Sequence, residues 1–155
     1  MYIKDIMPAS VITAHPSVRA SEVAELLADT GTNSIFVVEG DDLLGMITQA
    51  ELLRHVFPTY QEFYNDLVHN IDFDELEQRA RELTFMSAAE IMRPVDTTVS
   101  GDMPIMKVAA WMLLRDIGCV PVVDDDGRFQ GAVSRGDIFA HTVQRRLRDD
   151  AKVAV

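Results

Sequence analysis

The order of hydrophobic and polar residues predicts the same series of elements twice along the chain. A short apolar strand precedes a helix with apolar residues at helical spacing, two apolar runs joined by a polar turn predict a hairpin, and a second helix follows. In the first half we expect the strand at 11–13, a helix ended by Gly31, the hairpin at 34–48 and the last helix at 49–56. In the second half the same elements are expected at 97–99, 102–116 and 120–134, with the last helix starting near Asp137.

Short motifs repeat in the same order as these elements. Ile6-Met7-Pro8 returns as Ile91-Met92-Arg93-Pro94, and Gly45-Met46-Ile47-Thr48 returns as Gly131-Ala132-Val133-Ser134. Met7 and Met92 are 85 residues apart and Gly45 and Gly131 are 86 apart, so we place the extra residue in the turn at 124–127. Matching order and spacing indicate a duplicated unit.

The helix expected at 102–116 differs from its partner in the first half. Pro104 is expected in its first turn and Gly118 just past its end. Trp111, Met112, Leu113 and Leu114 form a continuous apolar block rather than a narrow stripe. We therefore expect this helix to meet apolar surface on more than one side, from the other half or from a second chain.

The segment at 55–88 has no counterpart elsewhere in the chain. Its apolar spacing fits two amphipathic helices broken near 70–72, and it carries seven acidic and two basic residues, a local net charge of −5. We interpret it as a solvated helical cover over a sheet or pocket, with a dedicated partner-docking arm as the alternative.

Composition narrows the class of protein. A chain of 155 residues with 48% hydrophobic residues can bury one good core or two small ones, and a net charge of −11 disfavours nucleic acid and anionic membranes as partners. The basic run at 145–148 fits the C-terminal end of a helix. Cys119 is the only cysteine, so no internal disulfide can form, and we expect it to be a buried thiol. With no apolar run of about 18 residues and no signal pattern, we expect a soluble cytoplasmic protein.

No group of residues points to catalysis. The four histidines lack the spacing of metal ligands, Ser100-Gly101-Asp102 fits a turn and helix cap, and 124–127 fits a hairpin turn rather than a calcium loop. No phosphate-cradling Gly-Lys motif is present. We expect no enzymatic activity from this chain, no metal site and no required cofactor.

The chain resembles tandem CBS domains in three features taken together. These are the duplicated Ile-Met-Pro motif, the Pro121-Val122-Val123-Asp124 run, and a glycine followed by two apolar residues, Thr or Ser and later an acid. The resemblance covers nearly the whole chain outside 55–88. It implies an α+β fold of two β-α-β-β-α units, packed sheet against sheet with pseudo-twofold symmetry, and a helical insertion between them. We place the first unit at 1–56, the acidic insertion at 57–86, the second unit at 87–148 and a flexible tail at 149–155.

In this family two clefts form between the units, and they commonly bind adenosine-containing ligands. At the first cleft Asp137 is expected to accept the ribose hydroxyls, and Ser134 with the following helix start faces ribose or phosphate, whose charge Arg135 offsets. The matching positions around the adenine are Ile12, Thr13, Asn33, Ser34 and Ile35.

The second cleft would pair Thr48 and Glu51 with positions of the other half. Those positions are Thr97, Thr98, Gly118, Cys119 and Val120. Glu51 stands where the family has Asp, and its longer side chain must lose more freedom on binding, so we expect unequal sites with the Asp137 site stronger. As an alternative, Thr48 and Ser134 are simple helix N-caps, and Glu51 and Asp137 are first-turn acids that need no ligand.

The leading hypothesis is a regulatory module that senses AMP, ADP, ATP or S-adenosylmethionine and relays occupancy to an unknown effector protein or through a homodimer. Two other classes stay open. One is a ligand-free module for dimerisation or docking, and the other is a sensor of divalent cations such as Mg²⁺, which the acidic segment at 55–88 motivates.

Overall fold

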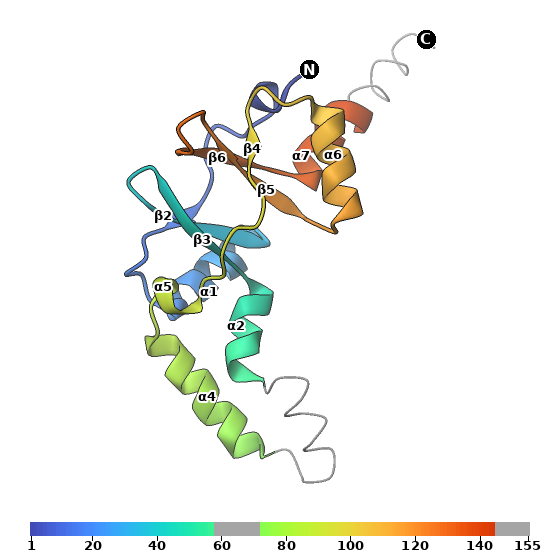
Figure 1. Ribbon diagram of the computed structural model, residues 1–155. Coiled ribbons are helices and arrows are strands. Elements are labelled where there is room, and N and C mark those ends of the chain that lie inside the picture. The colour runs from blue at the N-terminus through green and yellow to red at the C-terminus, as the bar shows by residue number, and fades with distance from the viewer. Residues whose placement is uncertain (58–71, 145–155) are drawn as a thin grey trace. The chain divides into compact units, whose positions relative to one another are not determined.

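The computed structural model describes residues 1–57 and 72–144, which form two compact α+β units (Figure 1). The first unit consists of residues 12–57 and 72–95, and the second of residues 1–11 and 96–144. The α+β class and the duplicated series of strand, helix, hairpin and helix are confirmed in both.

The first unit is built on a three-stranded sheet in the order β1-β2-β3. Strand β1 runs parallel to β2, and β2 and β3 form the antiparallel hairpin expected from the sequence. Helix α1 ends at Gly31, whose φ of 66° is the left-handed conformation that glycine adopts without strain. The elements are β1 (Thr13–Ala14), α1 (Ala20–Thr30), β2 (Ser34–Glu39), β3 (Asp42–Thr48), α2 (Gln49–Val56), α4 (Phe73–Phe85) and α5 (Ala88–Ile91).

The second unit repeats this sheet in the order β4-β5-β6, again with one parallel and one antiparallel pair. The hairpin turn follows the prediction: Asp124 accepts hydrogen bonds from the backbone N–H groups of Asp126 and Arg128, and Gly127 has a φ of 79°. The elements are η1 (Ile3–Asp5), β4 (Val99–Ser100), α6 (Ile105–Leu114), β5 (Cys119–Val123), β6 (Phe129–Ser134), α7 (Arg135–Phe139) and a π-helical turn η2 (Ala140–Gln144).

Two helices in the second unit have boundaries that differ from the sequence-based expectation. Pro104 is the N-cap of α6 rather than part of its first turn, and the helix ends at Leu114 because Asp116 takes a φ of 52° before Gly118 is reached. Helix α7 begins at Arg135, two residues earlier than expected, because Ser134 caps it.

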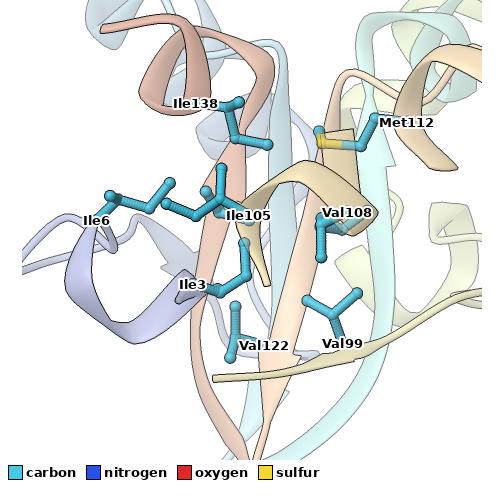
Figure 2. Close-up of a cluster of buried hydrophobic side chains, with 10 residues drawn as sticks. Ile3, Ile6, Val99, Ile105, Val108, Met112, Val122 and Ile138 are labelled. Carbon is cyan, nitrogen blue, oxygen red and sulfur yellow. The ribbon is translucent and has the colours of Figure 1, made fainter. Parts of the chain in front are cut away.

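Each Ile-Met-Pro motif packs into the core of the other half of the duplication. Ile3 and Ile6 lie in the second unit's core, beside Ile105 and Ile138 (Figure 2). The backbone N–H of Ile3 donates to the Met103 carbonyl at 3.0 Å, which holds this segment in place. Burying one such side chain stabilises a fold by about 1.5 to 3 kcal/mol, so residues 1–11 are an integral part of the second unit.

The first unit is completed in the same way by residues that precede the second copy. Ile91 and Ala88 of α5 are buried with Val23, Ile35 and Ile47. The backbone N–H of Ala88 donates to the Val18 carbonyl at 2.7 Å. In the folded protein, each unit therefore includes the Ile-Met-Pro segment that begins the other repeat of the sequence.

The second amphipathic helix expected in the 55–88 segment is confirmed as α4. Asp72 caps it by accepting hydrogen bonds from the N–H groups of Asp74 and Glu75, and it packs on α1 and α2 (Figure 1). Leu83 joins the edge of the first unit's core. The first helix expected in that segment, the basic run at 145–148 and the tail at 149–155 lie outside the described residues. None of the helices within 1–57 and 72–144 has both the length and the apolar character needed to cross a membrane.

Candidate functional site

The candidate site residues gather where the last strand of each sheet passes into a helix. Thr48 joins β3 to α2, and Ser134 joins β6 to α7. In both units the hydroxyl residue is the N-cap and an acid three residues later completes a capping box. The helix starts therefore carry the same local geometry, and the difference between them lies in the surroundings of the two acids.

In the second unit, Asp137 uses only one carboxylate oxygen for the capping box. Its Oδ2 accepts hydrogen bonds from the Ser134 backbone N–H at 2.8 Å and from the Ser134 hydroxyl at 2.6 Å. Within residues 1–57 and 72–144, Oδ1 accepts no hydrogen bond, and the side chain is only half-buried. A carboxylate oxygen in this state can accept hydrogen bonds from a bound molecule.

Other predicted residues of the second half lie beside this capping box. Cys119 pairs with Ser134 across the hairpin, and the backbone N–H of Arg135 donates to the Gly118 carbonyl at 3.0 Å. The Arg135 guanidinium forms an exposed ion pair with Asp116 at 3.3 Å. Cys119 is half-buried rather than fully buried, which corrects the expectation of a buried thiol.

In the first unit, both oxygens of the Glu51 carboxylate are occupied within the protein. Oε2 accepts hydrogen bonds from the backbone N–H and the hydroxyl of Thr48, and Oε1 contacts Arg54 Nη1 at 2.5 Å and Arg93 Nε at 3.2 Å. Glu51 is also buried. The arrangement leaves no carboxylate oxygen of Glu51 for a ligand unless an internal partner is displaced.

The surroundings of Glu51 determine its charge state. Burial alone raises the pKa of its carboxyl, but the hydrogen bonds from Thr48 and the positive charges of Arg93 and Arg54 outweigh burial, so the pKa lies below its usual value. Glu51 is therefore an anion at neutral pH, held by two guanidinium groups.

Arg93 reaches Glu51 because the segment after α5 is fixed to β3. Met46 and Arg93 exchange two backbone hydrogen bonds, of 2.9 and 3.0 Å. This close approach needs glycine at position 45, because a Cβ there would lie 2.8 Å from both the Arg93 carbonyl oxygen and the Met92 sulfur. Arg93 is thus held where its guanidinium pairs with the Glu51 carboxylate.

The second unit has no residue in the place of Arg93. Met7 packs near Gly131 as Met92 packs near Gly45, but Pro8 follows Met7 directly, so no arginine can stand between them. Neither Arg93 nor Arg54 is among the site residues predicted from the sequence. The signal was present, because Arg93 is an extra residue between Met92 and Pro94 that the first Ile-Met-Pro motif lacks.

The two predicted clefts each combine residues from both units, so they stay predictions. Within the first unit, Ser34 pairs with Thr48 in the hairpin, which places the predicted residues Asn33 and Ser34 beside that helix start. The side chains of Ile35 and Val120 are buried in the two cores, so these residues can offer a ligand only backbone groups. Ile12 and Thr13 belong to the first unit, and Thr97 and Thr98 to the second, where Thr97 accepts a hydrogen bond from Arg115 at 3.0 Å.

A separate hollow of about 280 Å³ lies within the second unit and contains none of the predicted site residues. It is lined in part by Lys4 and Asp102, which form an exposed ion pair at 2.6 Å, and by Asp124 and Asp125. Among the residues that the structure describes, no group of three or more His, Cys, Asp or Glu side chains is arranged to hold a metal ion.

Comparison with known proteins identifies both halves of the chain. The model of the CBS domain matches residues 3–58 and again residues 88–143. Uncharacterized protein MJ1225 of Methanocaldococcus jannaschii is 29% identical over 90% of this chain, and uncharacterized protein MK0525 of Methanopyrus kandleri is 26% identical over 88%. The chain spans 46% and 60% of these two relatives, or about half of their length.

Solved structures agree with this assignment. The crystal structure of MJ1225, described as a candidate archaeal homologue of g-AMPK, matches 90% of this chain and 47% of its own with 26% identity and a TM-score of 0.74. CBSX2 in complex with AMP matches 94% of this chain and 98% of its own with a TM-score of 0.70, and at 21% identity this likeness shows the fold alone.

Proposed function

The chain belongs to the CBS domain family and carries two copies of the domain, and we propose that it is a regulatory module that binds an adenosine-containing ligand. The ligand class is AMP, ADP, ATP or S-adenosylmethionine. Binding changes the conformation of the module, which passes the signal to an effector protein or through a homodimer of this chain. The module requires no catalysis and no resident cofactor for this role.

The observation that carries this proposal is the Oδ1 atom of Asp137, which accepts no hydrogen bond from the residues that the structure describes. A ribose presents two neighbouring hydroxyl groups, and a half-buried carboxylate with an unused oxygen is a natural acceptor for them. At the same junction the Ser134 hydroxyl and the N–H groups of Arg135 and Asp137 already make internal hydrogen bonds, so Asp137 Oδ1 is the group that this proposal offers to the ribose. The AMP complex of CBSX2 supports an adenine nucleotide as the ligand.

The two acids are not equivalent in this proposal. Glu51 already receives hydrogen bonds on one oxygen and two guanidinium contacts on the other, so a ligand hydroxyl would have to replace Arg93 or Arg54. Replacing a charge-assisted contact by a neutral one costs free energy. Ligand binding therefore depends mainly on Asp137, and Glu51 contributes chiefly to the stability of the first unit.

Isothermal titration calorimetry with AMP, ADP, ATP and S-adenosylmethionine tests this proposal on the wild type, Asp137→Ala and Glu51→Ala. Asp125→Ala serves as a matched control because it removes the same charge from the exposed hairpin turn of the same unit. We expect at least one ligand to bind, and Asp137→Ala to weaken it about tenfold or more, as loss of a charge-assisted hydrogen bond implies. Glu51→Ala and Asp125→Ala should change the affinity much less.

Equal losses in Asp137→Ala and Glu51→Ala would contradict the unequal roles of the two acids. Absence of any heat change, together with an unchanged melting temperature at rising ligand concentration, would contradict ligand sensing itself. It would favour a ligand-free docking module, for which the exposed apolar face of α6 is the supporting observation.

A further inference from the structure

Arg93 holds the carboxylate that corresponds to Asp137 in the other unit. Glu51 and Asp137 each complete a capping box with the hydroxyl residue three positions before. Arg93 Nε lies 3.2 Å from Glu51 Oε1, whereas Asp137 Oδ1 accepts no hydrogen bond from the residues that the structure describes. The Glu51 side chain is 5% exposed, and Asp137 is only half-buried. Of two equivalent acids, one is thus paired with an arginine at the oxygen that the other leaves available.

The backbone around Arg93 keeps its side chain in this place. Arg93 and Met46 of β3 exchange two backbone hydrogen bonds, of 3.0 and 2.9 Å. Helix α5, which leads into this segment, packs on α2, which carries Glu51 (Figure 1). A side chain whose backbone is already fixed loses less conformational freedom when it forms an ion pair. The contact between Arg93 and Glu51 is therefore part of the folded first unit.

Arg54 contacts the same oxygen of Glu51 from a less fixed position. Its side chain is 70% exposed, against 40% for Arg93, and it lies three residues after Glu51 on the same helix. Ion pairs of long side chains that are open to water contribute little free energy, so Arg54 can leave the carboxylate at small cost. Arg93 is the partner that a ligand would have to displace against the surrounding fold.

Apart from Arg93, the start of α2 has the same features as the start of α7. Glu51 Oε2 accepts the hydrogen bonds of the capping box from Thr48, as Asp137 Oδ2 does from Ser134, which leaves Oε1 in the role of Asp137 Oδ1. Burial raises the pKa of the Glu51 carboxyl, but the hydrogen bonds from Thr48 lower it more than either arginine does. Glu51 therefore stays a charged acceptor when Arg93 is removed.

The fold does not need an arginine in this place. Met7 and Met92 are the corresponding residues of the two Ile-Met-Pro motifs, but Pro8 follows Met7 directly, whereas Arg93 separates Met92 from Pro94. The second unit nevertheless forms the same order of strands and the same capping box. The contact of Arg93 with the first unit's acid thus needs a cause other than folding.

We propose that Arg93 closes the first unit's site to ligands, so that this chain binds one adenosine-containing molecule where its duplication provides two acids. The Arg93 guanidinium takes the position at Glu51 Oε1 that ribose hydroxyls take at Asp137 Oδ1. This inference rests on the proposed function, because it concerns the same class of ligand. It adds the residue that decides which of the two acids is open to that ligand.

Isothermal titration calorimetry of Arg93→Met with AMP, ADP, ATP and S-adenosylmethionine tests the inference by counting bound molecules. We expect one molecule per chain in the wild type and two in Arg93→Met, where only the exposed Arg54 still contacts Oε1. A structural defect alone would not add a binding site. Arg79→Met is the matched control, because it removes a guanidinium that pairs with Glu75 at 2.8 Å in the same unit. The control should still bind one molecule.

A second series isolates the first unit's acid. Asp137→Ala weakens the open site, and adding Arg93→Met should restore binding by about tenfold or more, the value of a charge-assisted hydrogen bond. Adding Glu51→Ala to that pair should remove the restored binding, because the acceptor itself is then lost. Restored binding that survives Glu51→Ala would contradict the role of Glu51 in the first site.

Arg93→Gln is the second variant should Arg93→Met fold poorly, as judged by circular dichroism. One bound molecule per chain in both variants, or two in the wild type, would overturn the inference and leave the proposed function standing. Binding by the Arg93 variants alone would support closure by Arg93 and contradict the role of Asp137. No binding by the wild type or by any variant would overturn the proposed function and this inference with it.

Discussion

Replacing the two capping acids by their amides should separate their structural roles. Glu51→Gln removes a buried negative charge that two hydrogen bonds from Thr48 and two guanidinium groups satisfy, whereas Asp137→Asn removes a charge with one occupied oxygen. The amide NH₂ that Glu51→Gln introduces would face hydrogen-bond donors, so part of the network would lose its acceptor. We therefore expect Glu51→Gln to be the more destabilising substitution.

The size of the difference follows from burial. Breaking a buried ion pair costs about 3 to 5 kcal/mol, and since Arg54 is exposed and Arg93 partly exposed, we expect a loss of about 2 to 3 kcal/mol for Glu51→Gln. Asp137→Asn should cost at most about 1 kcal/mol, the value of an N-terminal cap. For a chain of 155 residues each kcal/mol lowers the melting temperature by about 2 to 4 °C.

Urea and thermal unfolding of the ligand-free protein, followed by far-UV circular dichroism, measure both losses. Trp111 is the only tryptophan and lies in the second unit, so its fluorescence reports the unit that contains Asp137 separately. Arg93→Met should give an intermediate loss, because Arg54 still pairs with Glu51. Equal losses for the two amide variants, or a larger loss for Asp137→Asn, would contradict the stronger stabilising role of Glu51.

Three further predictions rest on the same structure. Because the pKa of Glu51 is lowered in the folded state, its contribution to stability is fully present above the unfolded pKa of 4.5 and is lost as pH falls through the folded pKa. Below pH 4.5 the unfolding free energy of the wild type should therefore fall more steeply than that of Glu51→Gln, by up to about 1.4 kcal/mol per pH unit. Parallel pH profiles for the two proteins would contradict this. Gly45→Ala should lower stability by about 1 to 3 kcal/mol in thermal unfolding, because the added Cβ clashes with the Arg93 carbonyl. Gly101→Ala, whose Cβ would lie 3.4 Å from the Lys4 Cβ, should be nearly neutral. Similar stability losses for both variants would argue against the clash. Leu83→Ala in α4 should lower the unfolding free energy by about 1 to 2 kcal/mol in the same assay, and Phe85→Ala, on the exposed side of α4, by less than about 0.5 kcal/mol. Equal values for the two variants would mean that α4 does not stabilise the first unit.

The sequence alone determined the duplication, the order of the elements and both helix caps. Apolar periodicity and the position of Gly31 located α1, and α2 begins and ends at the expected residues, Gln49 and Val56. The N-cap role of Thr48 and Ser134, given from the sequence as the alternative to ligand contact, is confirmed, and a hydroxyl followed three residues later by an acid is a local pattern. Local hydrogen bonding and side-chain spacing were sufficient for these features, since they involve residues close together in the chain.

The boundaries of α6 were harder to predict from the sequence. Pro104 can stand in the first turn of a helix or before it, and an aspartate can take the left-handed conformation that usually marks a glycine. The packing of Ile105, Val108 and Met112 in the second unit's core fixed the start and end of the helix.

The segments that complete each unit, and the difference between the two acids, depend on contacts between residues distant in the sequence. The Ile-Met-Pro motifs read as the beginning of their own repeats, yet each packs in the core of the other half, because burial of Ile6 and Ile91 depends on surfaces distant in sequence. The contact between Arg93 and Glu51 joins residues 42 positions apart and exists only because residues 92–93 dock on β3. The order of residues specifies which charges a chain carries, but the strength with which one carboxylate is held depends on the groups that folding brings within a few ångströms of it.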